Sequence, residues 1–242
     1  MELEKHWQQV FTERARSYTR PFEISHWTEK GFAARVKRLS SEIRKRLAPG
    51  HRVLDLGCGP GPYAALFERP VLLDYAAPVF ERLPTCQDGQ RVCGDFTHLP
   101  FRDAVFDGVL SVGMLQCHRL FRAHLTGLAR VLKPGAWFII ETLNSECAAL
   151  LQGLQPRPKN ALRGFNASPG DRCHFVLDEF VVYHAGALAR WFGEAGLPVS
   201  ECRYLYAVGA GRFLPVTTRR SAKSFYLAGV KSCAAPDLTK ST

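Results

Sequence analysis

The stretch VLDLGCGPGPY, residues 53–63, constrains the fold most, because an apolar run is followed at once by three glycines. Gly57, Gly59 and Gly61 occupy alternate positions directly after what reads as a buried strand. Three glycines so close together indicate a sharp turn or a ligand lying against the backbone. A glycine-rich turn between a first strand and a helix is the nucleotide-binding position of doubly wound sheets. We therefore expect a binding site for a nucleotide-containing ligand here.

Short apolar runs alternate with helix-compatible segments along the first 143 residues. The expected strands are Arg52–Leu56, Pro70–Asp74, Gln90–Gly94, Phe106–Val112 and Ala136–Thr142. Helices are expected over residues 3–18, 27–47, 119–132 and 185–195, with the second one amphipathic and ended by Pro49 and Gly50. This alternation is typical of a parallel sheet with helices on both faces.

The last third of the chain departs from that rhythm. Two extended runs, Val199–Val208 and Ser224–Lys231, are separated only by residues 209–223, which leaves no room for a packed crossover helix. We expect these runs to pair antiparallel at one edge of the sheet. The predicted fold class is α/β, a doubly wound, seven-stranded, mostly parallel sheet with an antiparallel last strand and an N-terminal helical cap.

The cap is assigned to residues 1–48 and the ligand-binding domain to residues 49–242. Within this domain, segment 144–183 is long for a loop and contains three prolines, which is typical of a lid or binding element. We expect it to form part of a ligand-binding site together with the cap.

Composition excludes several classes of protein. The net charge is +10, but residues 51–143 are balanced and the basic excess lies in the two flanks. No apolar run approaches the roughly 20 residues of a membrane span, and the N-terminus has acids where a signal peptide would be basic and then apolar. A cytoplasmic location follows as an expectation. The eight cysteines are scattered without a CxxC pair, so we expect neither a metal site nor a disulfide framework.

The residues around the glycines argue against a dinucleotide. Pro62 stands where the third glycine of a dinucleotide fingerprint would fall, and Asp55 lies two positions before Gly57. A pyrophosphate needs bare N–H donors, whereas an acid at this position repels it and suits a ligand with an ammonium group.

Several motifs in order resemble the class I S-adenosylmethionine-dependent methyltransferases, and in particular their small-molecule subgroup typified by the ubiquinone/menaquinone biosynthesis methyltransferases. VLDLGCGPG is similar to their first motif, VLLDYA places Asp74 at the end of the second strand, and GDFTHLPF places Asp95 after the third. FDGVLSVGMLQC and LARVLKPGAWFIIE are similar to the fourth strand and to the helix, turn and fifth strand that follow. The likeness covers residues 50–143 and, more loosely, the chain to about residue 231.

This resemblance implies S-adenosylmethionine as cofactor, S-adenosylhomocysteine as product, and no metal. It implies that Asp74 accepts hydrogen bonds from the ribose hydroxyls, that Asp95 accepts one from the adenine amine, with Phe96 against the ring, and that Asp55 and Gly57 lie by the methionine end. The implied cofactor-binding residues are Asp55, Gly57, Cys58, Gly59, Gly61, Asp74, Tyr75, Asp95, Phe96, Ser111, Val112 and Gln116.

Three positions depart from the family pattern. Asp55 and Asp74 are closer together than is usual, so the helix after the glycines should be stunted. Gly127 stands where a glutamate is usual, and Cys117 stands where the subgroup often has a histidine. The last difference removes a candidate base.

The expected reaction is an in-line transfer of a methyl group, in which the protein mainly holds donor and acceptor together away from water. A base is needed only where the acceptor must lose a proton, and the candidates are His118, His174 and His184. The expected acceptor is a small aromatic, lipid-like or natural-product molecule, either neutral or carrying phosphate. Aromatic residues of the cap and of segment 144–183 should surround it or simply pack the cap: Trp7, Phe11, Tyr18, Phe22, Trp27, Phe175, Phe180 and Tyr183.

Two other functions remain open at this point. HLPFRDAVFDGVLSV and the short segment after the glycines also resemble tRNA wobble-uridine methyltransferases, and the basic flanks suit a phosphate backbone, although the sequence contains no separate RNA-binding module. A module that binds the cofactor without catalysis is the second alternative. An NAD-dependent oxidoreductase is disfavoured by the glycine spacing, and the oligomeric state is open.

Overall fold

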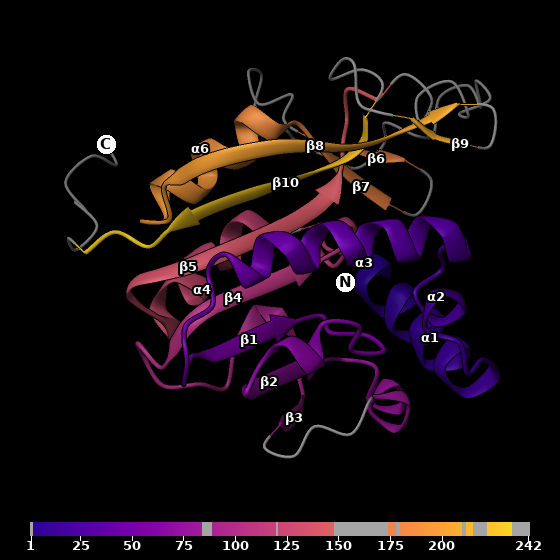
Figure 1. The fold of residues 1–242 in the computed structure, drawn as a ribbon, viewed down its shortest axis with the longest axis horizontal. Coiled ribbons are helices and arrows are strands. Elements are labelled where there is room, and N and C mark those ends of the chain that lie inside the picture. The colour runs from indigo at the N-terminus through magenta and orange to yellow at the C-terminus, as the bar shows by residue number, and fades with distance from the viewer. Residues whose placement is uncertain are drawn as a thin grey trace.

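A computed structural model of the 242-residue chain describes residues 2–83, 89–119, 121–147, 174–177, 180–209, 212–214 and 222–233. A sheet of eight strands in the order β3-β2-β1-β4-β5-β10-β8-β9 runs through it (Figure 1). Its strands are β1 (Arg52–Leu56), β2 (Arg69–Asp74), β3 (Gln90–Cys93), β4 (Phe106–Val112), β5 (Leu132–Leu143), β8 (Val199–Gly209), β9 (Arg212–Leu214) and β10 (Ala222–Val230).

The pairing of the strands confirms the predicted fold class. Strands β3, β2, β1, β4 and β5 pair in parallel, whereas β10 pairs antiparallel with both β5 and β8. The prediction that the last two long runs pair with each other is therefore confirmed. Strand β9, three residues at the edge, extends the expected seven strands to eight.

Three helices precede the sheet: α1 (Glu2–Ser17), α2 (Pro21–Ile24) and α3 (Glu29–Arg44). Proline begins α2, and the side chain of Thr28 caps α3 by accepting a hydrogen bond from the Gly31 N–H. In Figure 1, α3 lies along one face of the sheet, and α1 and α2 stand beyond the carboxyl ends of β1, β2 and β4. The cap therefore faces the edge where the glycine turn lies.

Neighbouring residues of each central strand point to opposite faces, and each face has its own core. On one face, Val53, Leu110 and Ile139 pack against Leu39 and Ile43 of α3. On the other, Leu54, Val109 and Phe138 join the core that contains α4 (Leu125–Val131) and α6 (Ala185–Glu194). Helices on both faces explain why the central strands read as nearly continuous apolar runs.

Short 3₁₀ turns replace full helices after the first strands. They are η1 (Ala64–Leu66), η2 (Ala77–Arg82) and η3 (Phe96–His98), with η4 (Leu115–Cys117) and η5 (Phe121–His124) after β4. The prediction of a stunted helix after the glycines is confirmed, because η1 is only three residues long.

Most of the expected lid, 144–183, lies outside the described residues, and so does most of 209–223. The described part includes the hairpin of β6 (His174–Leu177) and β7 (Phe180–Tyr183). Trp7 of α1 stacks on Phe180 with ring centroids 4.5 Å apart, which joins the cap to β7. Among the helices in the described part of the chain, none is long and apolar enough to cross a membrane.

Candidate functional site

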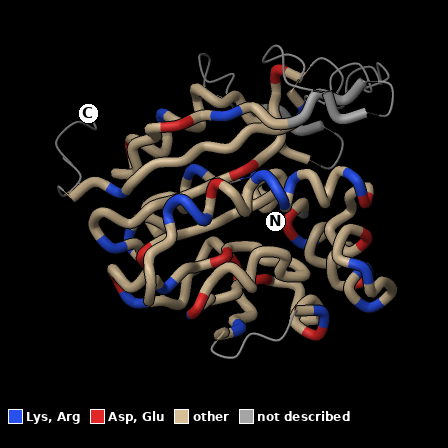
Figure 2. Tube along the Cα trace, in the orientation of Figure 1, with Lys and Arg blue, Asp and Glu red and all other residues tan. Residues whose placement is uncertain are grey.

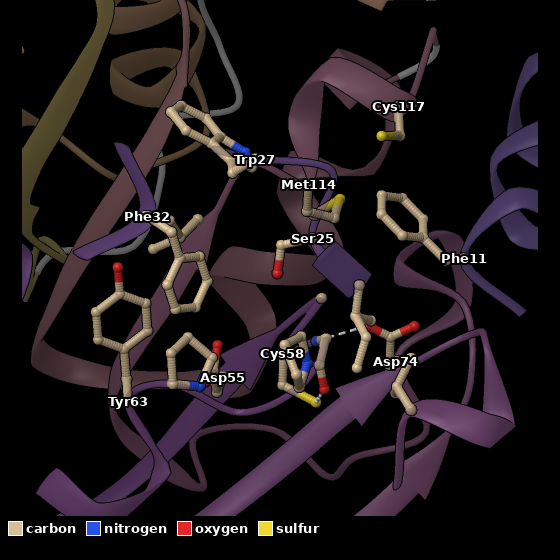
Figure 3. Close-up of a pocket in the computed structure, with 18 of the residues that line it drawn as sticks. Phe11, Ser25, Trp27, Phe32, Asp55, Cys58, Tyr63, Asp74, Met114 and Cys117 are labelled. Carbon is tan, nitrogen blue, oxygen red and sulfur yellow. Dashed lines mark hydrogen bonds between the residues drawn. The ribbon is translucent and has the colours of Figure 1, made fainter. Parts of the chain in front are cut away.

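A cavity opens at the carboxyl ends of β1, β2 and β4, between the sheet and the cap. Its empty volume is about 790 Å³, counting space open to solvent. In Figure 3, Asp55, Cys58 and Asp74 lie along its base, and Trp27 and Met114 lie across from them. Residues far apart in the chain, from the cap and from three strand ends, therefore share one cavity.

The glycine turn forms part of the cavity wall with its backbone. Gly57, Gly59 and Gly61 all have positive φ, at 72°, 51° and 64°, a conformation that other residues rarely adopt. A Cβ at Gly57 would also lie 2.7 Å from the Met114 side chain. The three glycines are thus explained by a tight turn that packs against the start of η4 and exposes its backbone to the cavity.

Asp74 ties this turn to the end of β2. Its carboxylate accepts hydrogen bonds from the Gly59 N–H at 2.8 Å and from the Ala76 N–H at 2.9 Å. A carboxylate has four acceptor positions, so further donors such as a pair of hydroxyls can still bind. Asp74 is thereby held in place at the base of the cavity.

Asp55 is buried in the cavity wall, and its Oδ2 has no hydrogen-bond partner among the described residues. Burial, reinforced by the charge of Asp74, raises the pKa of Asp55 to about 8. Burial also raises the pKa of Asp74 to about 6, although the backbone hydrogen bonds lower it in part. An ammonium group placed here would satisfy Oδ2 and offset the cost of ionising Asp55. These two carboxylates therefore fit the amino-acid end and ribose of S-adenosylmethionine as hydrogen-bond acceptors.

A second cavity lies beside the first and meets it at Tyr75, which lines both. Asp95 and His118 line it from the sheet side, and Glu4 and Gln8 of α1 line it from the cap. Asp95 caps η3 by accepting a hydrogen bond from the Thr97 N–H at 2.9 Å. The predicted adenine-binding residue thus faces a space that the cap helix helps to enclose.

The predicted cofactor-binding residues divide into three groups. The first cavity is lined by Asp55, Gly57, Cys58, Gly59, Asp74, Tyr75, Val112 and Gln116. Tyr75 and Asp95 line the second. The structure brings Gly61, Phe96 and Ser111 into neither lining: Phe96 is stacked on Phe121 in the core, and Ser111 is fully buried in β4. For Phe96 this leaves the backbone as the part that can contact a ligand.

The three candidate bases lie in different places. His118 is buried in the second cavity, where burial lowers its pKa. His184 precedes α6, lies 3.7 Å from a carboxylate oxygen of Glu146, and lines neither cavity. His174 is in β6, and its side chain is outside the described part of the structure.

Some of the aromatic residues expected around the acceptor line the cavity, and others are buried in the core. Phe11 and Trp27 line the first cavity, joined by Phe32 of α3, whereas Trp7 and Tyr183 are buried in the core. The Tyr183 hydroxyl donates a hydrogen bond to the His118 carbonyl at 2.8 Å. Packing of the cap therefore accounts for part of this set, and the cavity for the rest.

One charged cavity residue was missed by the sequence analysis. Arg35, on α3, lines the first cavity and forms a buried ion pair with Glu141 of β5. The signal was present, because Arg35 lies three residues after Phe32 and four before Leu39, and these spacings place it on the apolar face of the helix.

No group of three His, Cys, Asp or Glu side chains suited to a metal ion occurs within the described ranges. The absence of a metal from the reaction stays a prediction.

Comparisons with known proteins agree with this geometry. The methyltransferase domain family matches residues 54–140. A fatty-acid O-methyltransferase of Mycolicibacterium smegmatis is 34% identical over an alignment 103 positions long, and the match covers 37% of this chain and 36% of that protein. A probable tRNA methyltransferase 9B of Bos taurus is 37% identical over an alignment 98 positions long, and the match covers 38% of this chain and 21% of that protein. The chain thus spans about a third of the first relative and about a fifth of the second.

Solved structures support the fold. A possible histamine N-methyltransferase of Thermotoga maritima superimposes with a TM-score of 0.63 at 18% identity, covering 93% of this chain and 99% of that one. The narrower resemblance to ubiquinone/menaquinone biosynthesis enzymes stays a prediction. Taken with the strand order, the glycine turn and the aspartates at the strand ends, the methyltransferase domain over residues 54–140 supports a class I S-adenosylmethionine-dependent methyltransferase.

Proposed function

We propose that this protein transfers a methyl group from S-adenosylmethionine to a small-molecule acceptor. The observation that carries the proposal is one cavity in which Asp55 and Asp74, at the strand ends, face the aromatic cap residue Trp27. Donor and acceptor sites so close together suit a reaction whose main requirement is alignment.

The bound cofactor supplies an activated methyl group on its sulfonium. The chain's own residues bind and orient it: Asp74 accepts from the ribose hydroxyls, and Asp55 in its ionised form pairs with the ammonium group. The positive-φ turn at Gly57 lets the ligand lie on the backbone. The α1 helix, with Gln8 bonded to the Tyr75 carbonyl, covers the adenine side and excludes water.

The acceptor side is mostly apolar. Phe11, Trp27 and Phe32 supply ring surfaces, and Met114 and Cys117 complete the wall. Burial raises the pKa of Cys117 above its usual range, so this thiol stays protonated and is not a base at neutral pH. An aromatic or lipid-like acceptor that needs no strong base fits these walls best.

A tRNA acceptor is the second candidate, favoured by the tRNA methyltransferase relative and by four exposed basic residues at α3, namely Lys37, Arg38 and Arg44 within it and Lys45 directly after it. Figure 2 shows Lys and Arg spread over many elements with Asp and Glu among them. Binding of bulk tRNA with an affinity that falls steeply with salt would favour this candidate, and no binding at low salt would remove it.

The test of the proposal is calorimetric titration with S-adenosylmethionine, S-adenosylhomocysteine and NADH. We expect the first two to bind and NADH not to bind. Turnover is then measured as transfer of labelled methyl groups to a panel of aromatic and lipid-like acceptors. Binding without turnover on any acceptor would favour the non-catalytic alternative, and binding of NADH alone would overturn the proposal.

A further inference from the structure

Arg35 is a buried cation in the wall of the first cavity. Its side chain is 5% exposed, and its Nη2 donates a hydrogen bond of 2.7 Å to the Glu141 Oε2. The guanidinium carbon lies 4.2 Å from the centre of a Trp27 ring, within the range of a cation–π contact. The guanidinium is therefore fixed from two sides.

Space for the Arg35 side chain depends on a glycine opposite it, and burying the ion pair costs free energy. Gly113 has a positive φ of 74°, and a Cβ there would lie 2.5 Å from the Arg35 Nη2. Burying an Arg–Glu pair is often no better for stability than apolar residues of the same volume. Since the pair is expensive to bury and its Arg35 member lines a cavity, a ligand is the better explanation for it.

Arg35 has hydrogen-bonding capacity to spare. Its one hydrogen bond within the described residues goes to Glu141, and its Nε has no partner there. A guanidinium carries five N–H donors in a planar fork that matches the two oxygens of a carboxylate. Glu141 thus acts as a positioning residue, and donors remain for a ligand in the cavity.

The pair marks the acceptor side of the cavity rather than the cofactor side. Asp55 is on β1, whereas Glu141 is on β5, two strands away in the order β1-β4-β5, or about 10 Å at the usual strand spacing. The ring of Phe32, three residues earlier on α3, lies in the same cavity as Arg35. A cation and apolar rings together fit a molecule with one anionic end.

We propose that Arg35 binds a carboxylate on the acceptor, so that the substrate is an aromatic or aliphatic carboxylic acid. This inference rests on the proposed methyl transfer in the same cavity. Glu141 already neutralises Arg35, so a bound carboxylate adds a net negative charge, which the sulfonium of the cofactor balances. The acceptor therefore binds more tightly beside a cationic cofactor than beside neutral S-adenosylhomocysteine.

The probes are benzoate, 3-phenylpropanoate and decanoate, each with its matched alcohol, titrated into the ligand-free protein and into protein saturated with S-adenosylhomocysteine or with sinefungin. Sinefungin is an unreactive analogue with an amine-bearing carbon in place of the methyl sulfonium. We expect at least one acid to outbind its alcohol about tenfold and to bind more tightly with sinefungin than with S-adenosylhomocysteine.

The variants are Arg35→Lys, which keeps a charge opposite Glu141, and the double variant Arg35→Met with Glu141→Met, which leaves no unpaired buried charge. Arg38→Lys is the matched control, three residues further on the same helix with a side chain 51% exposed. Only variants that show a cooperative thermal unfolding transition are used for the titrations. We expect about a tenfold loss of carboxylate binding in the Arg35 variants, unchanged S-adenosylhomocysteine binding, and no loss in the control.

Loss of S-adenosylhomocysteine binding with unchanged carboxylate binding would overturn the inference by assigning Arg35 to the cofactor. It would equally be overturned if no acid outbinds its alcohol. If the wild-type protein binds no S-adenosylhomocysteine, the proposed function fails, and the titrations of the ligand-free protein still decide whether Arg35 binds carboxylates.

Discussion

The cavity has two halves, one proposed to bind the cofactor and one proposed to bind the acceptor, and they are built in different ways. The cofactor half uses backbone turns and carboxylates from residues 55–75, a short piece of chain that folds on itself. The acceptor half joins α1 and α3 to the end of β5, and its central ion pair connects residues 106 positions apart. The first half is formed by residues close together in the chain, whereas the other half exists only when the cap is docked. Substitutions can test this contrast.

The largest effect is expected from Asp74→Ala. Loss of two charge-assisted hydrogen bonds to ribose should weaken binding of S-adenosylhomocysteine by about 100-fold or more. The measurement is calorimetric titration, with Asp103→Ala as control because that carboxylate is 75% exposed on the surface. Binding within threefold of the wild type in Asp74→Ala would contradict the assignment of the cofactor half.

Alanine at two glycines should separate the halves. Gly57→Ala combines a positive φ with a 2.7 Å contact to Met114, so we expect a loss of about 1–3 kcal/mol of unfolding free energy and weaker cofactor binding. Gly113→Ala combines a positive φ with a 2.5 Å contact to the Arg35 Nη2, so it should change acceptor binding more than cofactor binding.

Gly127→Ala is the control for both, since nothing lies within 4 Å of a Cβ there and the position is inside α4. It should stabilise the protein by up to about 1 kcal/mol in denaturant unfolding. Equal effects of Gly57→Ala and Gly113→Ala on both ligands would remove the distinction between the halves.

The pH dependence should come from the cofactor half. The raised pKa values of Asp55, about 8, and Asp74, about 6, mean that the folded state keeps protons that the unfolded state loses. The unfolding free energy of the ligand-free protein should therefore fall as pH rises from about 4 towards 8, by at most about 1.4 kcal/mol per pH unit for each proton. Cofactor affinity should rise over the upper part of that range, because the ammonium group favours ionised Asp55.

Asp55→Asn is the comparison for this prediction. Unfolding measured across pH should lose the part of the slope above pH 6 in this variant. A slope there identical to that of the wild type would show that Asp55 does not hold a proton in the folded protein.

The smallest effects are expected at the histidines. His118→Gln removes a buried wall of the second cavity and should weaken cofactor binding by up to about tenfold, the value of one hydrogen bond or contact. His184→Gln alters a half-exposed side chain away from both cavities and should leave binding and single-turnover rate within about twofold. A greater loss in His184→Gln than in His118→Gln would reverse the placement of the two residues.

The same contrast explains what could be predicted from the sequence. The places of Gly57, Asp55 and Asp74 in the fold were predictable because strand, turn and strand end are set by residues close together in the chain, as was the antiparallel pairing of β8 and β10. The Arg35–Glu141 pair was not, because a helix pattern shows that Arg35 faces inward but not which strand it meets. Phe96 was expected against the adenine ring, and the core packing around Phe121 places its side chain elsewhere.

The two bonds that Asp74 accepts have a consequence for the motions of the ligand-free protein. With only 3₁₀ turns after β1 and β2, the loops holding Gly59 and Ala76 have few helical hydrogen bonds, and one carboxylate cross-links them. Amide hydrogen exchange should therefore be fast around η1 and η2 and slow in β4 and β5. Protonation of Asp74 weakens this cross-link. The edge of the sheet that receives the cofactor is therefore also the edge that opens first.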